Sequence, residues 1–264
     1  MLNFHPLYSS SSGNMFHLES AKANILIDIG VTFKAANDGL KLIEKSFNDI
    51  DALFITHEHI DHIKGLSLLC RKTDIPVYAC GKTADFLNEM LSEKNISANI
   101  IKVNYNEKIQ IKDLDIIPFE TNHDAIMPCG YKIFNEDNSI TYATDLGVVS
   151  NEVFENLKSS NLVILEANYD ETMLDFGKYP YYLKRRIKSD LGHLSNNEAA
   201  NTILRLVKDG QANFLLAHIS ENNNTLDLAR DIIKCTLQEN DIDFNTLNIS
   251  FASKSLSNEV IEIC

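Results

Sequence analysis

Two spacings of apolar residues divide this chain into expected elements. Short runs that are mostly apolar predict strands, and apolar residues three or four positions apart predict helices. In the first third of the chain we expect strands at 15–20, 24–30, 52–56 and 75–80, and helices at 38–47, 63–72 and 82–94. The two earliest strands follow each other closely, so they are expected to pair.

After residue 99 the apolar period changes to two. Successive antiparallel strands are expected over 99–121, a hairpin over 129–145 and a buried strand at 161–168. Ser195 and Glu198 have the spacing of a capping box, so a helix should begin there. A strand at 213–220, a helix at 225–240 and a last strand at 247–255 follow. Strands and then helix–strand units in both halves predict two packed sheets with helices outside, in one domain over residues 1–264.

Length and composition limit the class of protein but do not identify its activity. The 264 residues, 44% of them hydrophobic, suffice for one large domain with its own core. No apolar run approaches the ~18 to 20 residues that span a bilayer, and the N-terminus lacks the pattern of a signal peptide. A cytoplasmic protein without membrane contact is therefore expected. The five cysteines form no C-x-x-C pair, which argues against a zinc knuckle or a redox dithiol.

A cluster of metal-capable side chains follows one expected core strand. Within the sequence ITHEHIDHIKG, residues 55–65, three histidines and two acids fall within the six positions 57–62. Other acids and histidines also lie at or just beyond the end of an apolar run, namely Asp28, His123, Asp145 and His218. Because polar groups at strand ends line the clefts of α/β folds, these residues could converge although they span most of the chain.

The spacing inside this cluster predicts two neighbouring metal ions. Two histidines separated by one residue can face one ion from an extended loop, and the Asp-His pair that follows can serve a second ion. One later histidine would complete each ligand shell, and an aspartate could bridge the ions with its two oxygens. The expected ligands are His57, His59, Asp61, His62, His123, Asp145 and His218, with Asp28 behind them. Imidazole and carboxylate without thiolate suit zinc, manganese or iron, and two such ions would hold a bridging hydroxide.

The H-x-H-x-D-H pattern after a core strand resembles the metallo-β-lactamase superfamily, over nearly the whole chain. This resemblance implies a four-layer αβ/βα sandwich with the metals between the edges of its two sheets. The segments SSSSGN, ITHEHIDHIKGL, NHDAIMPCGY, ATDLG, LEANYDETML, GHLSNNEAA and AHISENNNTLDLA occur in the order seen in bacterial YycJ/WalJ-like proteins. That family is regarded as 5′-to-3′ DNA exonucleases linked to mismatch repair. It often has His where this chain has Tyr169, so a proton-transfer role for this position is in doubt.

The expected activity is a metal-dependent hydrolase, with zinc favoured over manganese or iron. We expect a phosphodiesterase that degrades DNA from 5′ to 3′, in which Asp61 orients the attacking hydroxide. Two other activities stay open, namely hydrolysis of a small ester, thioester or lactone, and RNA processing. A non-catalytic binding module would lack some of the ligands, and none is missing. Protein partners cannot be inferred from the sequence.

Two late histidines compete for the last ligand position. His218 directly ends an apolar strand, so the rigid sheet edge should place it as a ligand. His193 instead precedes a helix N-terminus capped by Ser195, where free amides and the helix dipole favour an anion. We therefore expect His193 to meet a substrate phosphate or to protonate the leaving oxygen.

The remaining candidates concern substrate binding. The segment YPYYLKRRIKSD carries Lys184, Arg185 and Arg186 beside three tyrosines in a chain of net charge −13. That charge argues against general nucleic-acid binding but does not exclude a local basic groove. Phosphate contact with base stacking, and a solvated helix face, are equal alternatives for this segment. In the serine-rich loop near the N-terminus, Ser11 and Asn14 are weakly favoured for a place near the metals over a simple turn.

Overall fold

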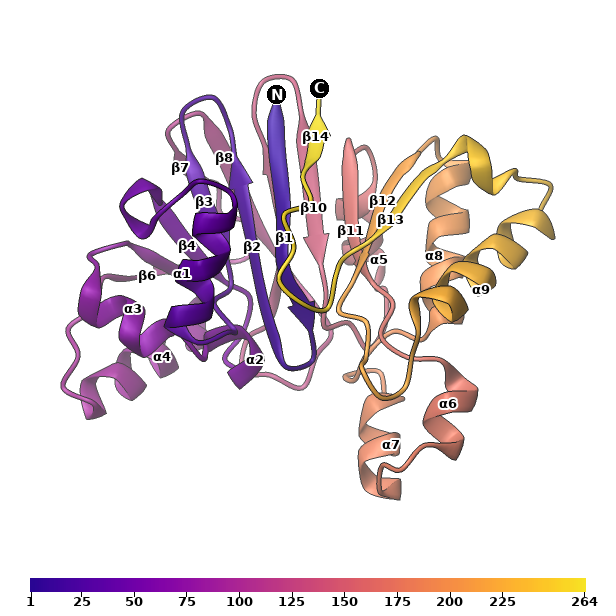
Figure 1. Ribbon diagram of the computed structural model, residues 1–264, viewed down its shortest axis with the longest axis horizontal. Coiled ribbons are helices and arrows are strands. Elements are labelled where there is room, and N and C mark those ends of the chain that lie inside the picture. Colours follow the sequence, from indigo (N-terminus) through magenta and orange to yellow (C-terminus); the bar gives the residue numbers. More distant parts are fainter.

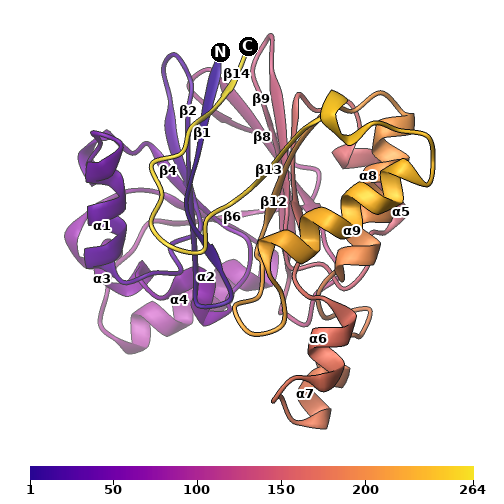
Figure 2. The same cartoon turned by 45° about the vertical axis from the view of Figure 1, so that its right-hand side comes forward.

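Two seven-stranded sheets face each other in the computed structural model, which describes residues 1–264. Helices cover the outer side of each sheet, so that the chain forms four layers (Figures 1 and 2). This arrangement confirms the predicted αβ/βα sandwich. Both termini lie at the end of the sandwich opposite to α6 and α7, the two helices that project from it in Figure 2.

The first sheet comes from the N-terminal half of the chain and one strand from the C-terminus, in the order β14-β1-β2-β3-β4-β5-β6. Its strands are β1 (Leu2–Ser10), β2 (Gly13–Glu19), β3 (Asn24–Ile27), β4 (Ala52–Ile55), β5 (Val77–Cys80), β6 (Ile100–Val103) and β14 (Ile261–Ile263). The helices of this half are α1 (Phe33–Leu42), α2 (Ile60–Ile63), α3 (Leu66–Lys72) and α4 (Gly81–Glu93), with a short 3₁₀ turn at Phe47–Asp49. β3 to β6 pair in parallel, whereas β1, β2 and β3 pair antiparallel.

The second sheet has the order β13-β12-β11-β10-β9-β8-β7. Its strands are β7 (Ile109–Ile111), β8 (Leu114–Glu120), β9 (Cys129–Phe134), β10 (Ser139–Ala143), β11 (Leu162–Glu166), β12 (Asn213–Ala217) and β13 (Asn248–Phe251). The helices of this half are α5 (Asn151–Leu157), α6 (Glu171–Phe176), α7 (Tyr181–Ile187), α8 (Asn196–Lys208) and α9 (Leu226–Gln238), with a 3₁₀ turn at Phe244–Thr246. As in the first sheet, an antiparallel part joins a parallel part, here from β10 to β13.

Apolar side chains from both sheets fill the space between them. Phe16 of β2 lies 5.0 Å from Tyr142 of β10 between ring centroids. Phe54 of β4 lies 5.4 Å from Tyr131 of β9, and all four rings are fully buried. Burying a large apolar side chain contributes roughly 1.5–3 kcal/mol to folding. The Tyr131 hydroxyl also donates a 2.6 Å hydrogen bond to the carbonyl of Ile55, which fixes the second sheet to the end of β4.

Several predicted elements are confirmed. The hairpin of β9 and β10 forms as expected. Helix α8 begins after Ser195, whose hydroxyl accepts from the backbone of Glu198, while the Glu198 carboxylate reaches back to the backbone of Ser195. None of the helices combines the length and apolarity needed to cross a membrane.

Three predicted elements differ from the structure. The stretch 99–121 is not a series of antiparallel strands, because β6 pairs in parallel with β5 in the first sheet and only β7 and β8 pair antiparallel. The helix expected at 38–47 begins at Phe33, where the Thr32 side chain caps it, and ends at Leu42. The strand at 247–255 is not the last, since β14 follows and pairs with β1.

His17 of β2 is a buried histidine on the outer side of the first sheet. Its side chain is fully buried, and its Nε2 lies 3.1 Å from the Asn24 amide oxygen. Burial lowers the pKa of His17 to about 4, and neighbouring His5 and Lys45 act in the same direction against the opposing charge of Glu19. His17 is therefore neutral in the folded chain near neutral pH.

Candidate metal centre

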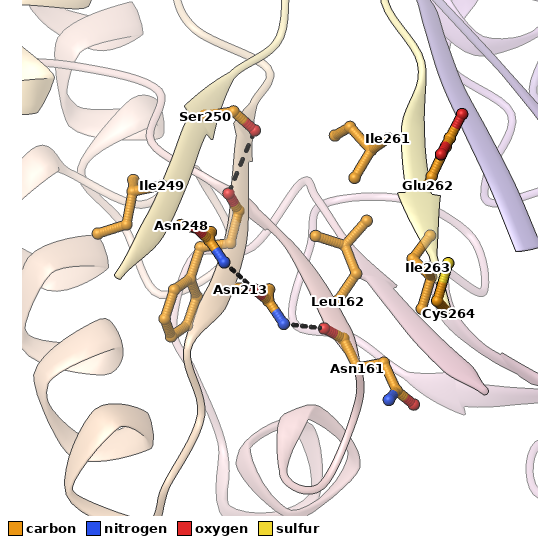
Figure 3. A pocket seen from close by; sticks show the side chains of 11 residues that line it. Asn161, Leu162, Asn213, Asn248, Ile249, Ser250, Ile261, Glu262, Ile263 and Cys264 are labelled. Atoms are coloured by element: carbon orange, nitrogen blue, oxygen red, sulfur yellow. Dashed lines mark hydrogen bonds between the residues drawn. The ribbon is translucent and has the colours of Figure 1, made fainter. Parts of the chain in front are cut away.

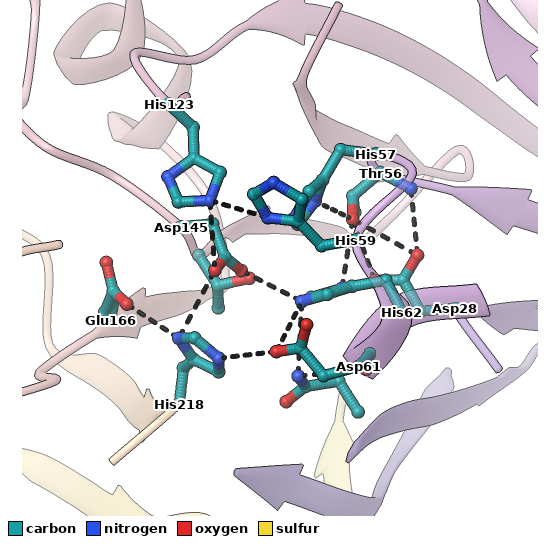
Figure 4. A network of polar contacts seen from close by, with 12 residues as sticks. Asp28, Thr56, His57, His59, Asp61, His62, His123, Asp145, Glu166 and His218 are labelled. Carbon is teal, nitrogen blue, oxygen red and sulfur yellow. Dashed lines mark hydrogen bonds and ion pairs between the residues drawn. The ribbon is translucent and has the colours of Figure 1, made fainter. Parts of the chain in front are cut away.

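Polar residues follow the ends of strands at one edge of the sandwich. Asp28 comes after β3, His57 after β4, Asp145 after β10 and His218 after β12. Asp28, Asp145 and His218 have positive φ angles of 60°, 56° and 54°. A side chain in this conformation costs about 1–3 kcal/mol, and such strain clusters at functional sites. The side chains of these four residues lie together in Figure 4.

Three histidine nitrogens converge on one point. Nε2 of His57 lies 3.1 Å from Nδ1 of His59, which lies 3.3 Å from Nε2 of His123. The three ligand atoms all lie within 4.8 Å of one another. The structure therefore brings together three of the predicted metal ligands, from the loops that follow β4 and β8.

A second group lies beside the first. Asp61, His62 and His218 also place their ligand atoms within 4.8 Å of one another. Oδ2 of Asp61 is 3.5 Å from Nε2 of His62 and 3.6 Å from Nε2 of His218. Asp145 lies between the groups, because its Oδ2 is 3.3 Å from Nε2 of His62 and its Oδ1 is 3.7 Å from Nε2 of His123. All seven predicted ligands meet at one place, and Asp145 can reach both groups (Figure 4).

Hydrogen bonds behind the histidines determine which nitrogen each one presents. Nδ1 of His62 donates to Oδ2 of Asp28 at 2.7 Å, and Nδ1 of His123 donates to a backbone carbonyl at 2.9 Å. The Thr56 hydroxyl donates to Asp28 at 2.9 Å, so it accepts from Nδ1 of His57 at 3.0 Å. In each ring the N–H points away from the site and the Nε2 lone pair points into it. Asp28 thus has the supporting position expected for it.

Glu166, the last residue of β11, was not among the predicted site residues. Its Oε1 accepts from Nδ1 of His193 at 2.8 Å and from Nδ1 of His218 at 2.7 Å. Its Oε2 accepts from the backbone N–H groups of Leu146 at 2.9 Å and Leu194 at 3.2 Å. The carboxylate is fully buried, so its hydrogen bonds come from these four protein donors. Both histidines keep Nε2 free as a result.

The sequence did carry a signal for Glu166. It directly follows the apolar residues 162–165, as Asp145 follows the run before it. Thr56 also escaped prediction, because a threonine after a strand is common and nothing local marks it as a partner of a histidine. Both residues act through the histidines that they hold.

Carboxylates and burial act in opposite directions on the histidines of the cluster. Burial opposes a charge on His218, but Asp145, Asp61 and Glu166 outweigh it and raise the pKa of His218 to about 10. Burial raises the pKa of Asp61, but His62 and His218 outweigh this effect and bring the pKa below its usual range. The carboxylates therefore favour positive charge in the second group, whereas burial lowers the pKa of His57 and of His123 in the first group.

The donor atoms fit divalent cations. Oδ2 of Asp145 and Nε2 of His218 are buried and have no hydrogen-bond partner, which is costly for bare polar atoms. The three converging nitrogens of the first group lie 3.1 and 3.3 Å apart, close enough for one cation to bind all three. Imidazole and carboxylate donors without thiolate suit zinc, manganese or iron.

Of the two N-terminal loop residues predicted near the metals, Asn14 is buried and Ser11 is exposed. Asn14 is buried, and its amide nitrogen lies 3.3 Å from the Asp61 carbonyl oxygen and 3.2 Å from Nε2 of His62. Because it is buried and contacts Asp61 and His62, Asn14 has a supporting position behind the histidine motif. Ser11 is exposed in the turn between β1 and β2.

The three basic residues predicted for substrate binding all lie on α7. The Lys184 ammonium donates to the backbone carbonyls of Asp175 at 2.8 Å and Gly177 at 2.7 Å, so it caps the end of α6. Arg186 forms a two-pronged ion pair with Asp124, next to a predicted metal ligand. Only Arg185 is exposed without such a partner.

Tyr169 belongs to the small apolar cluster of α6 and α7. It is 5% exposed and packs with Leu174 and Ile187 beneath α6 and α7. Burial raises the pKa of Tyr169 above its usual value, so its phenol stays protonated. This position supports the doubt about a proton-transfer role.

A separate hollow of ≈ 370 Å³ lies between β13 and β14 (Figure 3). Side-chain amides line part of it, with Asn213 donating to the carbonyl of Asn161 at 2.8 Å and Asn248 donating to Asn213 at 2.7 Å. These residues precede or begin parallel strands, whereas the metal-capable cluster follows the strand ends. The hollow contains no histidine and is not part of the candidate metal centre.

Comparisons with known proteins agree with this geometry. Residues 23–219 match a family described as the beta-lactamase superfamily domain. The chain is 35% identical over 238 residues to exodeoxyribonuclease YycJ of Bacillus anthracis, covering 90% of both chains. It is 37% identical over 224 residues to exodeoxyribonuclease WalJ of Streptococcus pneumoniae, covering 84% of this chain and 83% of the relative. The structure of the metallo-beta-lactamase fold protein YhfI from Bacillus subtilis matches with a TM-score of 0.71 and 14% identity over 98% of both chains, a likeness of fold alone.

Proposed function

This chain belongs to the metallo-β-lactamase superfamily and, within it, to the YycJ/WalJ-like family, and on that premise we propose that it is an exodeoxyribonuclease that uses two divalent metal ions. The family relationship supports a metal-dependent hydrolase. That the substrate is DNA and that two ions take part are our proposals. Zinc is the favoured metal, with manganese or iron as alternatives, and the direction of 5′ to 3′ follows the family resemblance.

The observation that carries the proposal is the pair of donor groups on the two sides of Asp145. His57, His59 and His123 form one group, and Asp61, His62 and His218 form the other. Two ions held by these groups would supply Lewis-acid chemistry, by lowering the pKa of water and by stabilising charge on the oxygens of a phosphodiester.

The protein side chains supply orientation and proton transfer. Asp61 is the most exposed carboxylate of the cluster, with 19% of its side chain exposed, and its Oδ1 forms no hydrogen bond within the protein. This oxygen can accept a hydrogen bond from the attacking water and so orient it. His193 is 15% exposed, and Glu166 holds its Nδ1. Its Nε2 is therefore free of protein partners, and when the ring also carries a proton there, this nitrogen can pass that proton to the leaving oxygen.

A nuclease assay tests the proposal. A single strand and a duplex, each with a 5′-phosphorylated strand that carries a fluorophore at its 3′ end, would be incubated with purified protein and Zn²⁺, Mn²⁺ or Fe²⁺, or with a chelator. We expect metal-dependent release of mononucleotides, with the fluorophore retained on progressively shorter strands, and no release by the Asp61→Ala variant. Absence of nucleotide release with every metal would refute the nuclease. Turnover of a thioester or lactone under the same conditions would then assign the small-molecule alternative.

A further inference from the structure

Three exposed aliphatic side chains lie in the loops that carry metal-capable histidines. Ile60 is 68% exposed, Leu191 is 49% exposed and Ile126 is 43% exposed. Ile60 stands inside the H-x-H-x-D-H motif, and Ile126 follows His123 by three positions. Leu191 precedes His193 by two positions. We refer to the side chains of Ile60, Ile126 and Leu191 as the apolar rim.

Hydrogen bonds join the three loops of the apolar rim to one another. The backbone N–H of Ile126 donates to Oε1 of Glu58, in the histidine motif, at 2.9 Å. The Leu191 carbonyl accepts from the backbone N–H of Asp124 at 2.9 Å, and the Asp124 carboxylate pairs with Arg186. The three aliphatic side chains therefore belong to one connected surface, although they come from distant parts of the chain.

This surface lies beside the candidate catalytic residues. Ile60 is bonded directly to Asp61, the residue proposed to orient the attacking water. Exposed apolar groups gathered in one place mark interaction sites, because a bound molecule removes their surface from water. A molecule packed on the apolar rim would also lie next to the metal-capable cluster, so we take that molecule to be the substrate of the proposed nuclease.

The chemistry of the apolar rim limits the part of a DNA duplex that it can contact. Two isoleucines and a leucine carry no charge and no hydrogen-bonding group, so they do not recognise phosphates or the polar edges of bases. Aliphatic side chains do pack against the faces of bases where a stack is open. Along a duplex each base pair is covered on both faces by its neighbours, and only the terminal pair leaves one face uncovered.

We propose that the apolar rim packs against the uncovered face of the terminal base pair and so makes a duplex end the preferred binding position. The inference rests on the proposed nuclease function and specifies how that site selects an end. Ile60, Ile126 and Leu191 are then residues that determine specificity, separate from the metal ligands and from the residues that transfer protons.

Binding measurements test the apolar rim separately from turnover. Fluorescence anisotropy would compare two DNA molecules with the same duplex sequence and an internal label, using the Zn²⁺-loaded protein. One is a blunt linear duplex, and the other is a dumbbell in which loops join the strands at both ends. Phosphorothioate linkages slow cleavage of the linear duplex, and 5′-hydroxyl ends remove any contribution from a terminal phosphate. We expect the wild type to bind the linear duplex about tenfold or more tightly than the dumbbell.

Paired variants separate apolar contact from other effects. Ile126→Ser/Leu191→Ser should lose most of the preference for the linear duplex and bind the dumbbell as the wild type does. Ile126→Leu/Leu191→Ile keeps the apolar surface and should keep the preference. Leu42→Ser is the matched control, because Leu42 is 44% exposed on α1, outside the first sheet. Melting temperature and zinc content would show that each variant is folded and loaded, and Ile60→Ser provides a second test if the double Ser variant does not fold.

Equal affinity of the wild type for the linear duplex and the dumbbell would overturn the proposal. A full preference for the linear duplex in the folded Ser variants would overturn it as well, and so would an equal loss in Ile126→Leu/Leu191→Ile. If the wild type prefers duplex ends through the apolar rim but releases no nucleotide with any metal, the nuclease function fails while the inference about end binding stands. Nucleotide release without a preference for ends would have the opposite meaning.

Discussion

Replacing Glu166 with Gln removes one buried negative charge and leaves the size of the side chain almost unchanged. The Glu166 carboxylate accepts four hydrogen bonds, two from imidazole N–H groups of His193 and His218 and two from backbone N–H groups. A glutamine has one oxygen with two lone pairs and an NH₂ group that only donates, so it satisfies at most two of the four donors. The other two donors would remain buried opposite an amide that cannot accept.

The number of donors left without a partner sets the expected loss of stability. An unsatisfied buried donor costs about 1–3 kcal/mol, so Glu166→Gln should lower the free energy of unfolding by about 2–6 kcal/mol. His218 would also lose the partner that holds its Nδ1, and such partners change metal affinity by about 10- to 100-fold. His193 would lose the orientation of its Nε2, so turnover should fall even when metal is supplied in excess.

Urea unfolding of the metal-free protein measures the stability term alone, and titration with Zn²⁺ followed by elemental analysis measures metal affinity. Glu120→Gln, at an exposed position on β8, is the matched control for the loss of one charge. Glu166→Asp tests the effect of side-chain length apart from that of charge. The shorter carboxylate keeps the negative charge but cannot accept hydrogen bonds from all four donors. If Glu166→Gln matches the wild type in stability, metal content and turnover, Glu166 does not hold the two histidines as described.

Four further outcomes are expected. His193→Ala should keep both metal ions and lose most turnover, about 10²- to 10⁴-fold, whereas His218→Ala should lose one ion, so a metal-depleted His193→Ala in elemental analysis would reverse their roles. Gly30→Ala should lower both melting temperature and metal content, because a Cβ there would lie 1.5 Å from the carbonyl oxygen of Asp61; a variant with normal values would show that the motif can shift. Chelation should lower the melting temperature, since the candidate ligands come from both halves of the chain, and an unchanged melt after verified metal removal would contradict this. The pKa of His17 is about 4 in the folded chain and 6.5 ordinarily, so the unfolded chain binds the proton first and stability is lost as pH falls from 6.5 to 4. The metal-free His17→Gln variant should lack up to roughly 3 kcal/mol of this loss. If the free energy of unfolding changes with pH in the same way in both proteins, this reasoning is refuted.

Much of the fold and of the candidate site could be predicted from local patterns. Apolar spacing identifies strands and helices because each side chain's direction depends on its neighbours within a few residues. The positions of His57, His59, Asp61 and His62 within one loop made a shared metal site predictable. The rule that strand ends meet at one edge of an α/β sheet then linked Asp145 and the later histidines to them.

Only the tertiary structure decided which distant groups become partners. The apolar run of β6 suits either sheet, and its pairing with β5 depends on the packing of the whole sandwich. In the same way, Arg186 and Arg185 are adjacent and equivalent in sequence, yet Asp124 from another loop neutralises the first and leaves the second exposed. Glu166 accepts from His193 and His218 because two parallel strands and the loop before α8 end at the same place. Local spacing determines the direction of a side chain, but its partner is set by the free energy of packing segments that lie far apart in the chain.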